Sequence, residues 1–473
     1  MKKNIFKYVM AGSLLFSVSC TSDFLDVDSR DKVDAEDGTE VYDPVMLVNG
    51  TYGMLTDWDY AFSWLGVTEI ISDNADKGSS PTDAGSDKLE LDNLDHTSAT
   101  GSIGAMWTRF YKTIGRANLS IQYTENYGLT DQKYKNRLIG EAKFLRALHY
   151  FWLVRMFGDV PIQEIDNTES WLVRRPKAEV YAYIEKDLLD AIEVLPAKSE
   201  YAAADLGRAT KGAAQGLLSK VYLYEEKWQQ AYDMAGAVMS SGQYGLEDDY
   251  AKIWRLEGEN GKESLFEVQA RGNAIAHGVQ QYSQTQGARG TGGWGWGFNV
   301  PSQNLLDAFN AAGDNVRRDA TIIFRGETLY DGREVPQSVE NPMYNEKAYS
   351  SANLGDADTD KNIRILRYGE ILLIRAEAAV HIGADAATPL NMVRNRVHLQ
   401  SISNPTVQDI WKERRLELAF EHDRWFDLIR TGQAKAAMAA DGKNFEEGKD
   451  ELFPIPNAQL IQTPDMPQNP GWH

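Results

Sequence analysis

The segment Thr210-KGAAQGLLSKVYLYEEKWQQAYDMAGAVMS-Ser241 contains two helical patterns in direct succession. Apolar residues recur at intervals of three and four over residues 210–226, and again over residues 227–241. Small side chains, among them Ala214 and Ala235, stand on the apolar face of each pattern, where they allow two helices to pack closely. The segment therefore predicts a helix–turn–helix pair of the tetratricopeptide type.

Other parts of the chain repeat this pattern. Leu145, Leu148 and Trp152 predict one helix, which Gly158 and Pro161 should end. Further helices are predicted over residues 181–195, 368–381 and 386–398. The sequence thus predicts an all-α dominated fold, in which a tetratricopeptide-like helical-repeat scaffold carries long irregular loops.

The charged segment after Pro405 predicts a third helical pair. Trp411, Leu418 and Trp425 recur every seven residues and should share one buried face. The other side of this segment should carry salt bridges among Glu413, Arg414, Glu417 and Arg424.

Three long stretches lack helical patterns. Residues 72–100 are polar, acidic and rich in glycine, residues 272–300 are rich in glycine, glutamine and aromatic residues, and residues 327–360 are similar. Loops of this length in a compact protein are usually functional or disordered. We therefore expect an inserted, loop-rich binding region at about residues 270–360.

Residues 1–19 have the composition of a lipoprotein signal peptide. A basic start is followed by an apolar stretch, which is too short to span a bilayer, and then by small residues. Cys20 is the only cysteine of the chain and stands directly after the expected cleavage site, where lipid is attached. The sequence predicts a lipid anchor on Cys20, a tether over residues 20–40, and a single domain over residues 41–473.

The charge balance excludes one class of partner. Lys and Arg number 49 against 69 Asp and Glu, which gives a net charge of −20. Binding to nucleic acid needs a basic surface, so nucleic acid is not expected as a partner. The 12 Trp, 22 Tyr and 16 Phe fit a sugar-binding protein, whose aromatic faces pack on sugar rings, and equally fit a large core.

The motif Gly290-TGGWGW-Gly297 with its two tryptophans is the main candidate for a ligand platform. It contains G-x-G-x-x-G, but no apolar strand precedes it, so a dinucleotide site is not expected. Glycines let the backbone turn sharply and aim Trp294 and Trp296 outward, where indoles stack on sugar rings. The alternative is that one or both rings pack down as loop anchors. Trp58, Trp64 and Tyr344 are further candidates.

Asp73, Asn74 and Asp76 are close together in the first long loop. Their side chains are suited to hydrogen-bonding sugar hydroxyls or holding a cation, and equally to capping a helix. A calcium loop over residues 356–367 is not favoured, because Lys361 stands at the glycine position and Arg367 at the last ligand position. No sequence motif builds an active site, and His422 is expected to be structural. We therefore predict neither catalysis nor a cofactor.

Several segments, in order along the chain, resemble the SusD/RagB family of Bacteroidetes outer-membrane lipoproteins. They are Gly140-EAKFLRALHYFWLVRMFGDVP-Ile162, Gly207-RATKGAAQGLLSKVYLYEEKW-Gln229, Arg367-YGEILLIRAEA-Ala379, Glu413-RRLELAFEHDRWFDLIRTG-Gln433, Phe453-PIP-Asn457 and Gln468-NPG-Trp472.

The resemblance implies a tetratricopeptide-like scaffold with a variable ligand-binding region. It implies a protein of the outer leaflet that binds glycan and delivers it to a TonB-dependent transporter of the SusC type. It also implies a binding protein rather than an enzyme, with its aromatic platform in the loops. Two alternatives stay open: a family member that binds peptides, and an all-α glycosidase that uses a pair of loop acids such as Asp73 and Asp76.

Overall fold

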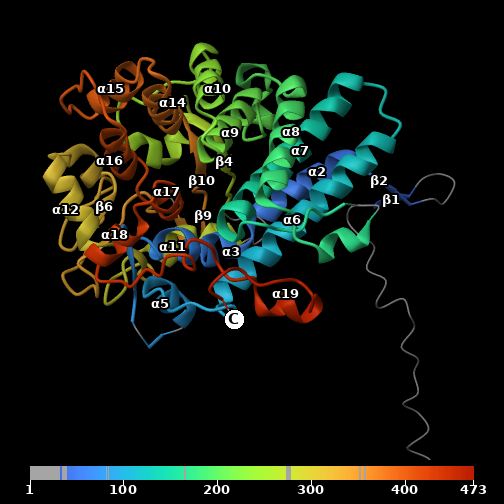
Figure 1. The fold of residues 1–473 in the computed structure, drawn as a ribbon. Helices are drawn as coiled ribbons and strands as arrows, with labels where there is room; N and C mark the ends of the chain where they lie inside the picture. The colour runs from blue at the N-terminus through green and yellow to red at the C-terminus, as the bar shows by residue number, and fades with distance from the viewer. Residues whose placement is uncertain are drawn as a thin grey trace, which may run out of the picture.

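A row of helices forms the scaffold of the computed structural model (Figure 1). The structure describes residues 32–34, 40–80, 82–83, 85–164, 167–272, 278–350, 353–355 and 358–472. Each helix of the row packs against the next. In order they are α6 (Gly101–Asn126), α7 (Gln132–Phe157), α8 (Lys177–Val194), α9 (Lys211–Tyr224), α10 (Trp228–Ser240), α14 (Tyr368–Ile382) and α15 (Ala387–Arg396). The predicted helical-repeat fold is confirmed.

The α9/α10 pair shows why these residues form closely packed helices. The Thr210 hydroxyl caps α9 by accepting a hydrogen bond from the Ala213 backbone N–H. Ala214 and Ala235 are buried on the inner faces, as the sequence predicts. A Cβ on Gly216 would lie 2.6 Å from Leu265 of the neighbouring strand, so the absence of a side chain permits this approach.

The ends of two other helices follow their flanking residues. Helix α7 ends at Gly158, whose φ of 68° lies in the region that favours glycine. Helix α8 begins at Lys177, four residues before the predicted start, because Pro176 already stands at its N-cap position.

The segment after Pro405 forms two helices, as the predicted helical pair requires, but Trp411 and Trp425 lie on different helices and not along one helix face. Helix α16 (Val407–Glu417) ends before α17 (Arg424–Arg430) begins, and Phe420 and His422 between them have positive φ values of 61° and 69°. Leu418 and Trp425 are nevertheless buried, as expected. Trp411 is half-buried and donates its indole N–H to Glu377 at 2.9 Å.

The charged residues of this segment are buried instead of lying in solvent. The Glu417 carboxylate accepts hydrogen bonds from Arg317 at 2.8 Å, from Arg367 at 2.6 Å, and from Arg396. We call these four residues the carboxylate hub. Burial alone would raise the pKa of Glu417, but the three guanidinium groups hold that pKa well below its usual range. The salt bridges expected of Glu413, Arg414 and Glu417 are present, but these residues are buried and pair with others, such as Arg317 and Asp427.

The strands form short two-stranded ladders that fasten loops to the scaffold. β3 (Ala75–Gly78) pairs with β5 (Phe298–Pro301), and β4 (Ser264–Val268) pairs with β10 (Ile363–Arg367), both antiparallel. The others are β1 (Lys32–Asp34) with β2 (Glu40–Tyr42), β6 (Ile322–Phe324) with β7 (Met343–Asn345), and β8 (Asn353–Gly355) with β9 (Asp358–Thr359). The β3–β5 ladder matters most, because it joins the first and second long loops.

The remaining helices are short. They are α2 (Pro44–Gly53), α3 (Trp58–Ala61), α4 (Ser63–Leu65), α5 (Ser86–Asp92), α11 (Tyr282–Gln286), α12 (Gln303–Ala312), α13 (Asn315–Asp319), α18 (Ala434–Ala440) and α19 (Asn457–Gln462). Within the described ranges, no helix combines the length and apolarity needed to cross a membrane.

Candidate functional site

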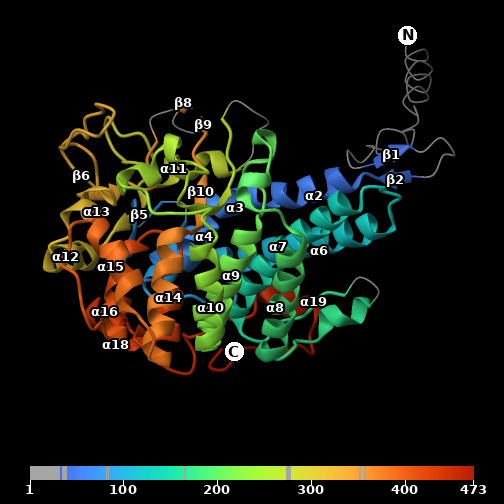
Figure 2. The same cartoon turned by 90° about the horizontal axis from the view of Figure 1, so that it is seen from above.

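Three part-exposed aromatic rings meet where the second long loop packs on α3. Trp58 and Phe62 stack with ring centroids 5.3 Å apart, and Trp296 meets Trp58 edge-on at 5.6 Å. Trp58, Phe62 and Trp296 are each only partly buried. We call them the aromatic cluster. Helices α3 and α11 lie side by side at this place in both views (Figures 1 and 2).

A buried lysine makes a cation–π contact with the aromatic cluster. The Lys88 ammonium lies 3.7 Å from the centre of the Phe62 ring and pairs with Asp87 at 3.1 Å. Burial lowers the pKa of Lys88, and the Asp87 carboxylate opposes that change. Phe298 of β5 packs edge-on against Phe62 at 5.0 Å. The Phe62 ring is thus fixed by its neighbours, while Trp58 and Trp296 keep exposed surface.

The glycine-rich loop aims Trp296 at this cluster through close backbone crossings. The Trp296 N–H donates to the Gln284 carbonyl at 2.9 Å, and the Gly297 N–H donates to the Gly287 carbonyl at 2.9 Å. A Cβ on Gly295 would lie 2.4 Å from the Gly287 Cα, so no side chain fits there. Glycine is therefore required at this crossing, where the loop brings Trp296 against Trp58 and Phe62.

Trp294 is a loop anchor, which is the alternative role that the sequence left open. Its ring is only 5% exposed and packs edge-on against Tyr349 at 5.4 Å. Tyr344 lies in the same small core as Trp294, and its hydroxyl accepts a hydrogen bond from the Asn341 backbone N–H at 2.9 Å. The prediction of an exposed sugar platform at Trp294 or Tyr344 is therefore wrong, because both rings are buried in the loop core. Trp64 is also buried.

Asp73 and Asn74 are structural in this fold. The Asp73 carboxylate is 1% exposed and accepts two hydrogen bonds from Arg424, both at 2.7 Å. Burial would raise the pKa of Asp73, but Arg424 and Arg415 outweigh it and lower that pKa. Asn74 is fully buried and accepts from Arg415 at 2.9 Å. Neither side chain is open to a ligand, so the prediction that they contact sugar is wrong.

Asp76 is part-exposed on β3, and its charged neighbours are Asp92, Asp441 and Lys443. The residue next to it, Lys77, is the one that lies over the Phe298 ring, at 5.1 Å. Burial and the neighbouring Asp92 raise the pKa of Asp76 to about 6, while Lys443 opposes them. Its expected role beside the platform finds no support in this placement.

Other polar groups surround the aromatic cluster and carry no sequence motif. Gln281 and Gln284 are part-exposed and stand on η9 (Gly278–Gln281) and α11, which both contact α3. Asp57 pairs with Arg109 at 2.6 Å at the start of α3. These side chains offer amide and carboxylate hydrogen-bonding groups beside stacking rings. The contacts of η9 and α11 with α3, which the sequence did not show, identify the two glutamines.

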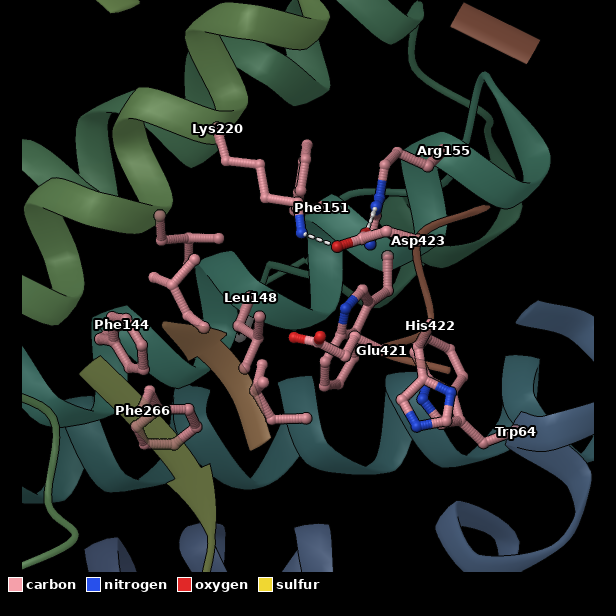
Figure 3. Close-up of a pocket in the computed structure, with 14 residues that line it drawn as sticks. Trp64, Phe144, Leu148, Phe151, Arg155, Lys220, Phe266, Glu421, His422 and Asp423 are labelled. Carbon is pink, nitrogen blue, oxygen red and sulfur yellow. Dashed lines mark hydrogen bonds and ion pairs between the residues drawn. The ribbon is translucent and has the colours of Figure 1, made fainter. Parts of the chain in front are cut away.

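A small cavity between the helices is lined in part by buried charged side chains (Figure 3). Its volume of about 20 Å³ accommodates a water molecule but no sugar ring. Asp423 on its wall pairs with Lys220 at 2.5 Å and with Arg155 at 2.9 Å, as the dashed lines show. Burial lowers the pKa of the adjacent His422 to about 3, so this histidine is neutral. The cavity belongs to the scaffold, which agrees with the structural role expected for His422.

Two features of the sequence fall outside the described residues. Cys20 with its signal peptide is one, and Asp356 of the acidic turn is the other. Asp360 of that turn accepts a hydrogen bond from the Gly272 N–H at 2.6 Å. Within the part of the chain that the structure describes, no group of three or more potential metal ligands is found.

Comparison with known proteins identifies the family. Residues 23–223 match a family model described as "Starch-binding associating with outer membrane", and residues 262–472 match the model of the SusD family. SusD-like protein P2 of Formosa agariphila is 30% identical over 470 residues, which cover 90% of this chain and 91% of that protein. The chain belongs to the SusD family.

Solved structures have the same fold. A laminarin-binding SusD-like protein superposes with a TM-score of 0.79 at 29% identity, covering 91% of this chain and 99% of that one. Surface glycan-binding protein A from Bacteroides fluxus superposes with a TM-score of 0.77 at 25% identity, over 91% and 99% of the two chains. These relatives are described as binding proteins and not as enzymes.

Proposed function

We propose that this protein is a cell-surface glycan-binding lipoprotein. It captures an oligosaccharide or polysaccharide on the aromatic cluster and delivers it to a SusC-like, TonB-dependent transporter in the outer membrane. The observation that carries the proposal is the pair of part-exposed indoles of Trp58 and Trp296, 5.6 Å apart and oriented by rigid backbone. Aromatic faces of this kind pack against the C–H faces of sugar rings.

Several features support a neutral glycan as the ligand. Gln281 and Gln284 supply uncharged donors and acceptors beside the rings. One structural relative is described as laminarin-binding, and another as a surface glycan-binding protein. A peptide ligand, the alternative within the family, more often uses strand addition or apolar pockets. Asp73, one of the two acids considered for a glycosidase, is buried in an ion pair and cannot reach a substrate.

Calorimetry of the mature protein tests the binding function. Laminarin should be titrated first, followed by a panel of neutral polysaccharides and a peptide mixture. Sugars compete poorly with water, so affinity should lie between micromolar and millimolar, or about −4 to −8 kcal/mol. Trp58→Ala and Trp296→Ala should each weaken binding about tenfold or more, with little loss of stability. Leu189→Ala on α8, exposed and remote, is the matched control.

Three results would contradict this function. Binding of peptides and of no glycan would favour the alternative ligand class. Equal affinity in the parent and both tryptophan variants would remove the aromatic cluster from the site. Release of reducing sugar during the titration would reveal a glycosidase.

Membrane attachment is tested separately. Cys20→Ala should leave the protein unprocessed or release it from the membrane, because the lipid would have no attachment point. Membrane fractions of the parent should also contain a co-purifying TonB-dependent transporter. A variant that stays membrane-bound at its normal mature mass would contradict the lipid anchor.

A further inference from the structure

A second hollow lies at a distance from the aromatic cluster. It has a volume of about 510 Å³ and runs between α6, η4 (Thr168–Leu172) and α19. In the view from above, α11 and β9 lie on one side of the molecule and α19 on the other (Figure 2). The volume falls within the range of about 300–1,000 Å³ that is typical of small-molecule sites. We call this hollow the α6–α19 groove.

The floor of the groove is aromatic and fixed. Trp107 and Tyr111 stand one turn apart on α6, with ring centroids 4.9 Å apart. The Trp107 indole N–H donates to Gln459 at 3.1 Å, and the Tyr111 hydroxyl donates to the Pro161 carbonyl at 2.9 Å. With both polar atoms bonded, the rings are held in place as an apolar floor.

Small residues of α6 keep the groove open. Gly104 and Gly115 both line it. A Cβ on Gly104 would meet only Pro456, at 3.9 Å, so a larger side chain there would enter free space. Gly115 stands in the middle of α6, where glycine costs about 1 kcal/mol relative to alanine, so its presence on this face calls for a reason such as an open groove.

One wall presents an indole to solvent. Trp171 is 47% exposed although it lines the groove, and Leu172 beside it is 50% exposed. Large apolar side chains that are exposed together mark interaction sites more often than chance placement does. A ring in this position can stack on a ligand that lies in the groove.

The polar lining is almost entirely uncharged. It consists of the amides and hydroxyls of Thr108, Gln163, Gln459, Gln462 and Thr463, with Lys112 as the one cation and no acid. The Oε1 atom of Gln163 is buried and accepts no hydrogen bond within the described residues. A buried acceptor without a partner costs free energy, which a ligand hydroxyl would recover.

From these observations we infer that the α6–α19 groove is a second binding site, for a neutral oligosaccharide or a stretch of a polysaccharide chain. The Trp171 indole stacks on one sugar ring, and Gln163 accepts a hydrogen bond from a hydroxyl group. The inference goes beyond the proposed function, because it does not depend on the aromatic cluster, although it assumes the same class of ligand. Two sites on one chain would hold a long glycan by a second, intramolecular binding step.

The experiment measures the second site in a protein that lacks the first. A chain with both Trp58→Ala and Trp296→Ala is titrated with laminarin, and then with the other neutral polysaccharides of the panel. It should keep measurable binding. Adding Trp171→Ala should weaken that binding about tenfold or more, and adding Gly104→Leu, which fills the groove, should do the same. Val173→Ala is the matched control, since Val173 is 59% exposed, adjoins the wall and does not line the groove.

The outcomes separate the two proposals. No saccharide binding in the parent would overturn both. Binding in the parent that disappears with Trp58→Ala and Trp296→Ala would support the aromatic cluster and overturn the second site. Residual binding that is insensitive to Trp171→Ala and Gly104→Leu would also overturn it. Loss of a co-purifying membrane protein in Trp171→Ala, with saccharide binding intact, would identify the groove as a protein-docking surface instead.

Discussion

The carboxylate hub and the aromatic cluster are both built from segments far apart in the sequence, but they differ in what they leave open. In the hub, Glu417 is fully buried and bonded by three guanidinium groups. In the cluster, Trp58 and Trp296 are only partly buried and keep exposed surface. Side chains whose bonding is satisfied internally stabilise the fold, whereas side chains with unused contact surface are available to a ligand. The following substitutions test this distinction.

Removing the hub carboxylate should have the largest effect. In Glu417→Gln, Arg317, Arg367 and Arg396 stay buried but lose a charged partner, which should cost about 5 kcal/mol of unfolding free energy. Urea unfolding of the purified protein measures this loss. The matched control is Glu447→Gln, because Glu447 pairs with Lys435 in solvent, where such a pair contributes less than about 1 kcal/mol. Equal losses in both variants would show that the hub does not stabilise the fold.

Truncating a core ring of α17 should have a slightly smaller effect. Trp425 is 2% exposed and packs against Phe445 at 6.0 Å. Trp425→Ala should lose about 4 kcal/mol, because it removes buried apolar surface and leaves a cavity. A melting temperature unchanged from the parent would take Trp425 out of the core.

Two tryptophans separated by one residue sharpen the comparison. Trp294 is buried in the loop core, so Trp294→Ala should cost about 3 kcal/mol. Trp296 is part-exposed, so Trp296→Ala should cost about 1 kcal/mol and act mainly on glycan binding. Thermal unfolding and calorimetry on the same two proteins measure both quantities. A reversed order of stability would mean that the assignment of anchor and platform is wrong.

The sequence predicted the scaffold better than the site, and the reason is physical. Ala214 and Ala235 lie on local periodic faces, so their burial follows from spacing alone. The break between α16 and α17 could not be predicted from spacing, because Phe420 and His422 adopt positive φ values although neither is glycine. Nothing local marks Glu417 as buried, since its three partners come from distant segments.

The same limit applies to the candidate site. Trp294 and Trp296 have equivalent glycine neighbours, and only their distant partners, Tyr349 for one and Trp58 for the other, decide which ring is buried. Asp73 was suited to sugar binding by its chemistry, but Arg424, far along the chain, occupies its carboxylate. Side-chain type indicates what a residue can bind, while tertiary contacts decide whether it is free to do so.

The last prediction concerns a buried carboxyl that, unlike Glu417, has no cation bonded to it within the described residues. Glu69 accepts a hydrogen bond from the His422 N–H, and its other oxygen is buried without a partner. Burial, aided by Asp423, raises the pKa of Glu69 from 4.5 to about 8. The folded state therefore binds this proton more tightly than the unfolded state does. The resulting stability is complete below about pH 4.5 and is lost as the pH rises through about 8, by about 1.4 kcal/mol per pH unit at most.

Glu69→Gln cannot ionise, so its unfolding free energy should fall less steeply than that of the parent over this range. Urea unfolding of both proteins at a series of pH values measures the difference, and their stabilities should agree within about 1 kcal/mol at pH 4, where the parent carboxyl is protonated. Parallel profiles from pH 5 to 8 would mean that Glu69 is charged in the folded protein and that an unidentified partner compensates it.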